Sequence, residues 1–295
     1  MLSTNGTIEK PEDFVVEEVI SPKFLRKYER SSGKVKPVEG PYSLFILRKR
    51  KMTTEEALKI VSSNINVPLN SIGYAGLKDK FAVTSQCITI KDKENGLDGF
   101  CQSEVSLEKT SRTNRHISIG DLLFNKFTIT LHNCKSLDKI GQILSFIKKP
   151  IPNYFGPQRF SRNNAETGRK LLQRKINADK FSKEKAKFFV NAYQSHIFNK
   201  TLMVVKGKRL PLVGYNSKKI PKYMASLLAK DKISQKDFRF SGFLCAGSWR
   251  ETFIKIQDFN YSTKDDSLKL CFSLPKGSYA TIVLNKIQKG EWLCQ

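Results

Sequence analysis

One aspartate in a short basic turn is the residue of this chain best suited to covalent chemistry. Asp79 lies within Gly73–Gln86, directly between Lys78 and Lys80. Cations on both sides keep a carboxylate ionised, and an ionised carboxylate can act as a nucleophile towards a sugar or a base. The same pattern fits a turn carboxylate that only makes local ion pairs, and the residues alone leave both interpretations open.

Predicted strands on both sides of this turn would hold it in place. Residues 71–76 and 86–90 have strand character, and Gly76 permits a close approach of the backbone. A further strand is expected over Tyr42–Leu47, ahead of the basic run Arg48–Lys51. Such a run is most often solvated surface, and it can also contribute to polyanion binding or to a nuclear address.

Three further elements follow from local patterns. Thr53 and Glu56 have the spacing of a capping box and predict a helix start. From Asn125 to Leu131 apolar and polar side chains alternate, which predicts a strand. The apolar spacing after Ser136 predicts an amphipathic helix.

The second half of the chain changes in character. Helices are expected near residues 165–176, 183–205 and 222–230, and strands near residues 252–256, 268–272 and 279–284. This layout predicts an α+β fold, in which a sheet domain of residues 1–152 and 246–295 is interrupted by a smaller, basic, helix-rich insertion of residues 153–245.

Net charge indicates the class of partner. The 295 residues include 52 Lys and Arg against 27 Asp and Glu, a formal net charge of +25. A surface this basic attracts polyanions such as nucleic acid. Apolar runs are too short to cross a bilayer, so no membrane association is expected. The acidic first twenty residues resemble neither a secretory signal nor a transit peptide.

The cysteine, histidine and aromatic residues indicate which kinds of site and which nucleic-acid partner to expect. The six cysteines are scattered without a Cys-x-x-Cys pair, and the three histidines lack ligand spacing, so neither a metal site nor a disulfide framework is expected. Most of the 20 Phe and 9 Tyr must be core. Aromatic rings also stack unpaired bases, at about 1–3 kcal/mol each, which favours RNA over duplex DNA as the partner.

Seven segments, in order along the chain, resemble the motifs of the TruD family of pseudouridine synthases. The turn segment Gly76–Gln86 resembles the signature around the catalytic residue, and Asn153–Phe160 is close to a verbatim match. The remaining five are Pro11–Glu18, Gly120–Phe127, Ala192–Asn199, Gly247–Arg250 and Leu274–Thr281. The resemblance spans nearly the whole chain, and Ala192–Phe198 is closer to the archaeal and eukaryotic branch of the family.

The resemblance implies a fold, a reaction and a set of site residues. The fold is that of pseudouridine synthases, with a mixed, mainly antiparallel sheet and a smaller helix-rich insertion domain. Asp79 would be the catalytic aspartate in the isomerisation of a uridine to pseudouridine. Phe14 would pack beside the target nucleotide, with Asn125 and Phe127 flanking the active site and Tyr279 lining the pocket. Phe127 would offer a stacking face to the flipped base, although its strand position also fits plain core. Phe14 and Asn125 likewise have structural interpretations, as a core residue and a turn residue.

The same resemblance implies no cofactor and no metal, with RNA, most often tRNA, as the partner. No obligate protein partner is inferred, and the expected location is intracellular: cytoplasmic, or nuclear if the source is eukaryotic. Three features depart from the family pattern. The segment before Phe14 is short, and Lys10 is the candidate for the basic residue that family members commonly carry there. In addition, Ser161 replaces a glycine, and the insertion is small. The short segment before Phe14 and the small insertion keep a catalytically inactive RNA-binding or chaperone protein as an alternative. A DNA-binding regulator, which rests on charge alone, is a third.

Overall fold

The computed structural model describes residues 3–20, 28–31, 34–37, 40–91, 99–240 and 242–292. By its contacts the chain divides into two compact units. The first, here called the sheet unit, comprises Asn5–Leu137 and Ile256–Lys276. The second, the helical unit, comprises Asp138–Lys255, the chain from Gly277 onward and the first four residues. These bounds differ from those of the two domains expected from the sequence, and that domain assignment stays a prediction.

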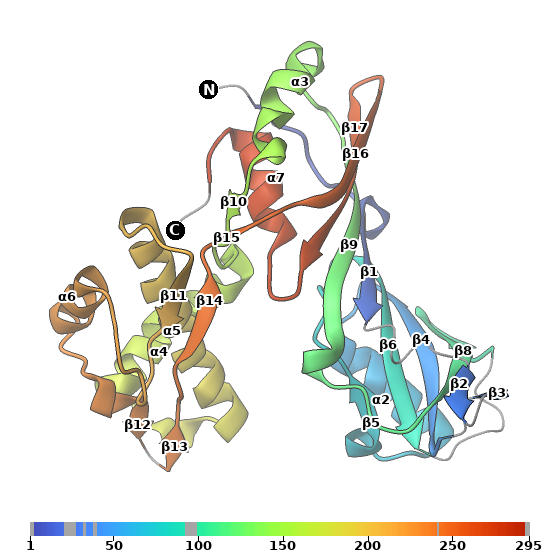
Figure 1. Cartoon of the computed structure of the whole chain (residues 1–295), viewed down its shortest axis with the longest axis horizontal. Helices are drawn as coiled ribbons and strands as arrows, with labels where there is room; N and C mark the ends of the chain where they lie inside the picture. Colours follow the sequence, from blue (N-terminus) through green and yellow to red (C-terminus); the bar gives the residue numbers. More distant parts are fainter. Residues whose placement is uncertain are drawn as a thin grey trace. The chain divides into compact units, whose positions relative to one another are not determined.

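A nine-stranded sheet is the framework of the sheet unit (Figure 1). Its strands follow the order β16-β17-β9-β1-β6-β4-β8-β7, with β5 also paired to β6. Only β1 and β6 run parallel, and every other pair in this sheet is antiparallel. The expected α+β fold with a mixed, mainly antiparallel sheet is therefore confirmed. Its strands are β1 (Phe14–Ile20), β4 (Tyr42–Arg50), β5 (Ile72–Tyr74), β6 (Val83–Lys91), β7 (Cys101–Gln102), β8 (Val105–Thr113), β9 (Leu122–Leu131), β16 (Gln257–Lys264) and β17 (Ser267–Pro275).

Helix α2 (Thr54–Ile65) covers one face of this sheet. Its capping box forms as expected: Glu56 N donates to Thr53 Oγ1 (3.1 Å), and Thr53 N donates to Glu56 Oε2 (2.7 Å). Buried apolar side chains of the helix pack on the strands beneath it, including Phe45 and Leu47 of β4. The remaining elements of this unit are the hairpin β2 (Tyr28–Ser31) and β3 (Lys34–Pro37) and the 3-10 helices η1 (Pro11–Asp13), η2 (Leu69–Ser71) and η3 (Ile119–Asp121).

Helix α5 (Lys183–Val204) is the core of the helical unit. It packs against α4 (Asn164–Leu172) and α6 (Lys222–Lys230), which bury apolar side chains against it. The helices expected near residues 165–176, 183–205 and 222–230 are thereby confirmed. The other α-helices of this unit are α3 (Ile140–Ile143) and α7 (Ala280–Lys289), and its strands are β10 (Ile151–Pro152), β11 (Arg209–Leu212), β12 (Arg239–Phe240), β13 (Phe243–Leu244), β14 (Ser248–Glu251) and β15 (Phe253–Ile254). Its 3-10 helices are η5 (Leu144–Lys148), η6 (Pro157–Asn163), η7 (Ala178–Lys180) and η8 (Gln235–Phe238). The 3-10 helix η4 (Leu137–Lys139) begins at the last residue of the sheet unit.

Two element predictions were wrong. Residues 279–284, expected as a strand, begin α7, whose buried Ala280, Val283, Leu284 and Ile287 recur at helical spacing. A short apolar run does not distinguish the two periods. The amphipathic helix expected after residue 136 is instead a single α-helical turn, α3, between two 3-10 segments.

No helix among the described residues is both long enough and apolar enough to span a lipid bilayer.

Candidate active site

Adjacent strands place three of the predicted site residues on one face of the sheet. β1 and β9 pair antiparallel, with Glu18 opposite Asn125 and Val16 opposite Phe127. Residues directly opposite each other, and residues two apart on one strand, point to the same side of a sheet. Phe14, Glu18, Asn125 and Phe127 therefore share a face.

The turn that carries Asp79 is fixed to this unit by main-chain hydrogen bonds. Gln86 Nε2 donates to the carbonyl of Gly76 (3.4 Å), and Lys78 N donates to Thr54 Oγ1 (2.9 Å). Thr54 Oγ1 itself donates to Gln86 Oε1 (3.0 Å), so the two anchors support each other. Both anchoring side chains are buried, and the turn therefore has little freedom at these points.

Lys49 supplies a third anchor from beneath the turn. Its Nζ donates to the carbonyls of Asp79 (2.8 Å) and Met52 (2.6 Å), and the residue is only 1% exposed. Burial lowers the pKa of this lysine to about 8, an effect that the nearby negative charge of Asp79 opposes. Lys49 thus holds the main chain of the turn and brings a positive charge close to Asp79.

Lys78 connects the turn to the two strands below it. Its Nζ lies 2.5 Å from Glu18 Oε1 in an ion pair, and it donates to Asn125 Oδ1 (2.8 Å). The side chains of Lys78 and Glu18 are 6% and 0% exposed. Burial raises the pKa of Glu18, and the adjacent Lys78 opposes this rise. A buried pair of this kind fixes the turn on the face that carries Asn125.

Asp79 as a residue is half-buried at this anchored turn. Of the residues that the structure describes, none donates a hydrogen bond to the Asp79 carboxylate, although Lys49 and Lys78 both hold neighbouring atoms. A carboxylate that is oriented by its backbone but not occupied by a partner is suited to attack an electrophile or to accept a proton.

The two predicted phenylalanines lie in the core of the same face. Phe14 is 7% and Phe127 5% exposed, and their rings meet edge to face with centroids 6.1 Å apart. Phe127 also stacks on Phe272 of β17, with centroids 5.4 Å apart. Both rings lie on the sheet face that carries Asn125, and Phe127 has one of its faces covered by Phe272.

Tyr279 belongs to the helical unit, so the structure does not group it with the other four predicted residues. It is the N-cap of α7, and its ring lies 5.9 Å from that of Phe155.

The sequence analysis missed Lys49, Glu18, Thr54 and Gln86 as parts of this site. Lys49 was included in a basic run interpreted as surface. The alternation that places Phe45 and Leu47 on the buried face of β4 also places Lys49 there, and this signal was available. Glu18 lies within a motif segment, but its pairing with Lys78 depends on the sheet register.

Comparison with known protein families matches residues 2–183 and 208–287 to the family tRNA pseudouridine synthase D (TruD). A curated protein of Wolinella succinogenes named tRNA pseudouridine synthase D is 38% identical over 198 residues, which cover 65% of this chain and 51% of that protein. The chain thus spans about half the length of that relative. A protein of the same name from Legionella pneumophila (strain Lens) is 28% identical over 94% of this chain and 93% of its own. A Methanocaldococcus jannaschii protein, "Probable tRNA pseudouridine synthase D 1", is 26% identical over 98% of this chain and 97% of its own.

A solved structure has the same fold. The crystal structure of a putative tRNA pseudouridine synthase D from Methanosarcina mazei matches with a TM-score of 0.64 at 20% identity, over 97% of this chain and 93% of that one.

Proposed function

Because the chain belongs to the TruD family of tRNA pseudouridine synthases, we propose that it isomerises a uridine of tRNA to pseudouridine, with Asp79 as the catalytic carboxylate. The observation that carries the assignment of Asp79 is its unoccupied carboxylate on a turn anchored by Lys49, Thr54 and Gln86. The turn lies in a segment that resembles the family signature.

The isomerisation leaves the atomic composition of the nucleotide unchanged, because the hydrogen that C5 loses to the solvent is matched by a proton gained at N1. Asp79 attacks the nucleotide or assists cleavage of the glycosidic bond between N1 of uracil and C1′ of the ribose. The freed uracil turns within the site, a bond forms between C5 and C1′, and any bond that Asp79 has formed to the nucleotide breaks again, which restores the carboxylate. The proton on C5 is then lost, and N1 carries a proton in the product. The family carries out this reaction without a cofactor or a metal, and no step above calls for one.

Asn125, Phe14 and Phe127 of the sheet unit form the protein side of the proposed uridine site, and the part of Tyr279 stays a prediction from the family resemblance. Lys78 orients Asn125 Oδ1 by donating to it (2.8 Å), which leaves the Asn125 amide NH2 to face a base. The buried rings of Phe14 and Phe127 give the site an apolar base, which strengthens polar contacts made above it. The target uridine must leave its stack to reach Asp79, at a cost of a few kcal/mol.

The substrate class also bears on where the protein acts. A net charge of +25 suits a long polyanion. We propose an intracellular site of action, where tRNA is processed.

Pseudouridine formation by Asp79→Asn tests the proposed function. The substrate is a pool of unmodified tRNA transcripts carrying tritium at C5 of uridine, because the tritium is released only when C5 loses its hydrogen. We expect at least about a thousandfold loss of release with Asp79→Asn and tRNA binding within about threefold of the unsubstituted protein. Asp265→Asn, which makes the same change at an exposed turn of the same unit, is the matched control and should keep full activity.

Retained tritium release by Asp79→Asn would exclude Asp79 as the catalytic carboxylate. Absence of release by the unsubstituted protein, with salt-dependent tRNA binding intact, would favour the catalytically inactive RNA-binding or chaperone protein.

A further inference from the structure

Two arginines of the helical unit are partly buried without an acidic partner. Arg159 is in η6 and Arg250 is in β14. Among the described residues, neither guanidinium forms an ion pair with a carboxylate; their hydrogen bonds go to neutral oxygens. Burial lowers the pKa of Arg250 to about 10 and also lowers the pKa of Arg159. A cation withdrawn from water costs free energy unless an anion compensates it.

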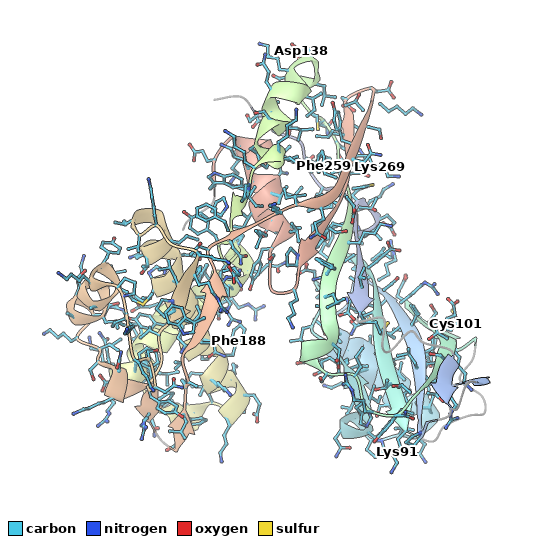
Figure 2. The ribbon with its side chains drawn as sticks, in the orientation of Figure 1. Lys91, Cys101, Asp138, Phe188, Phe259 and Lys269 are labelled. Atoms are coloured by element: carbon cyan, nitrogen blue, oxygen red, sulfur yellow. The ribbon has the colours of Figure 1, made fainter. Side chains whose placement is uncertain are left out.

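The two guanidiniums converge on one place. The Cζ atoms of Arg250 and Arg159 lie 4.1 Å and 5.9 Å from the centroid of the Phe155 ring. Each also interacts electrostatically with Tyr279, and the positive charge of Arg159 acts on Arg250. Arg159 lies in addition over the exposed ring of Phe188 of α5 (5.4 Å), which is labelled in Figure 2. Two positive charges held this close repel each other, and a bound anion would offset that repulsion.

Their hydrogen bonds leave donors unused. Arg250 Nε donates to the carbonyl of Asn153 (3.0 Å), and Arg250 Nη2 donates to Asn153 Oδ1 (2.6 Å). Arg159 Nε donates to Ser195 Oγ (3.2 Å). A guanidinium has five N–H groups, so the described contacts occupy two donors of Arg250 and one of Arg159. These contacts fix the planes of both groups and leave N–H groups for a ligand.

The start of α7 adds to the positive potential beside Arg250. Ser278 Oγ donates to Asn153 Oδ1 (3.3 Å), the same oxygen that accepts from Arg250. A Cβ added to Gly277 would lie 3.5 Å from Arg250 Nη1. The N-cap residue Tyr279 provides no side-chain cap. The N-terminus of a helix carries partial positive charge and free N–H groups, both of which favour an anion.

We propose that Arg159 and Arg250, beside the N-terminus of α7, bind a backbone phosphate of the RNA substrate. The guanidinium fork matches the oxygens of a phosphate, to which it can donate two parallel hydrogen bonds. A phosphate would supply these partly buried cations with the anion that no described residue provides, and the strongly basic chain favours a polyanionic source. This inference rests on the proposed function, which identifies the RNA as tRNA. It goes beyond that function by naming a site that binds the sugar-phosphate backbone of the RNA.

Three single substitutions test the proposal. Arg159→Gln removes one guanidinium and keeps a hydrogen-bond donor for Ser195. Arg250→Lys keeps a charge but loses the fork, and it avoids deleting the contacts to Asn153 outright. Arg209→Gln is the control: Arg209 is exposed, and Glu251 already neutralises it (3.1 Å).

The first readout is tRNA binding over a range of salt concentrations. We expect Arg159→Gln to weaken binding by about 10- to 100-fold, the effect of one lost charge-assisted contact, and to lower the salt slope by about one. Arg250→Lys should weaken binding by about tenfold, and Arg209→Gln by less than threefold. Affinity and slope unchanged in both Arg159→Gln and Arg250→Lys would overturn the proposal.

The second readout separates an RNA phosphate from a free one. Inorganic phosphate and uridine monophosphate are titrated against the protein, with the melting temperature as the signal, and are also used as competitors of tRNA. We expect weak stabilisation by both in the unsubstituted protein, none in Arg159→Gln, and competition with tRNA at millimolar concentration. Stabilisation of the unsubstituted protein without any competition with tRNA would mean a separate small-anion site and would contradict the proposal.

The Asp79→Asn variant distinguishes failure of this proposal from failure of the proposed function. If Asp79→Asn abolishes tritium release while Arg159→Gln and Arg250→Lys bind tRNA normally, the enzyme assignment stands and the phosphate site fails. If the unsubstituted protein releases no tritium but the arginine variants bind tRNA poorly, the phosphate site stands without the enzyme assignment.

Discussion

Lys78 of the sheet unit and Arg159 and Arg250 of the helical unit are withdrawn from water in opposite ways. In the sheet unit, Lys78 is neutralised within the chain by Glu18, which is itself fully buried. In the helical unit, Arg159 and Arg250 make hydrogen bonds only to neutral oxygens of the described residues. The pair of Lys78 and Glu18 is complete within the chain, whereas no described residue provides an anion for Arg159 and Arg250.

This difference indicates a structural role for the Lys78–Glu18 pair and a ligand-binding role for Arg159 and Arg250. A buried ion pair is costly to form, but breaking it is more costly still, because the remaining charge has no partner. It therefore fixes geometry, here that of the turn that carries Asp79. Arg159 and Arg250, which no described carboxylate compensates and whose described contacts leave N–H groups unused, instead favour binding of an external anion.

Breaking the pair in the sheet unit should have the largest effect on stability. Lys78→Met leaves Glu18 buried without a cation, and we expect a loss of about 3–5 kcal/mol in the free energy of unfolding, together with loss of activity as the turn is released. Chemical denaturation measures the first and tritium release the second. Lys80→Met is the matched control for stability, because Lys80 is exposed and a surface ion pair such as that with Glu56 (3.3 Å) contributes little.

Adding Glu18→Gln to Lys78→Met should restore part of the lost stability, since it removes the uncompensated carboxylate. A double variant as unstable as Lys78→Met alone would contradict the assignment of the loss to that charge.

The pH dependence of stability should show that Lys49 is buried as a cation. Its pKa is about 8 in the folded chain against 10.5 as the ordinary value. Between these two values the unfolded chain binds more protons than the folded chain, so the free energy of unfolding should rise with pH through that window, and Lys49 should add no pH dependence below it. The expected rise, relative to Lys49→Met, is on the order of 1 kcal/mol for each pH unit.

Denaturation of both proteins from pH 7 to pH 10.5 measures this difference. Asp79, Glu56 and Lys78 are the charged groups that act on Lys49, and all three are present in both proteins. Lys59→Met, at an exposed position of α2, serves as the control and should follow the unsubstituted protein. Parallel curves for the unsubstituted protein and Lys49→Met would show that Lys49 has an ordinary pKa.

Removing a cation in the helical unit should have the smallest effect on stability. Arg159→Gln deletes a charge that no carboxylate compensates, so we expect the free energy of unfolding to stay within about 1 kcal/mol of the unsubstituted protein. Thermal and chemical denaturation without phosphate measure it. A loss as large as that of Lys78→Met would mean that Arg159 is structural, and the contrast between the two units would disappear.

Much of the fold could be predicted from local patterns. The alternation of Asn125–Leu131 predicted β9, and the Thr53 and Glu56 capping box predicted the start of α2. The start of α7 was predicted as a strand, because its short apolar run fits either period and only packing selected the helix. Alternation along β4 was enough to predict that Lys49 is buried. Because Lys49 is charged and lies in a basic run, it was predicted as surface instead.

The sequence by itself determined the chemical groups and their local settings: an aspartate between lysines in a turn, strands around it, and motif segments that identify the family. Only the tertiary structure decided which charges are neutralised. Glu18 meets Lys78 because β1 and β9 place Glu18 and Asn125 side by side on one face. Arg159 and Arg250 converge on Phe155 although ninety residues separate them in the sequence. The partner of a buried charge depends on register and packing across the chain, and neither is encoded in the residues next to it.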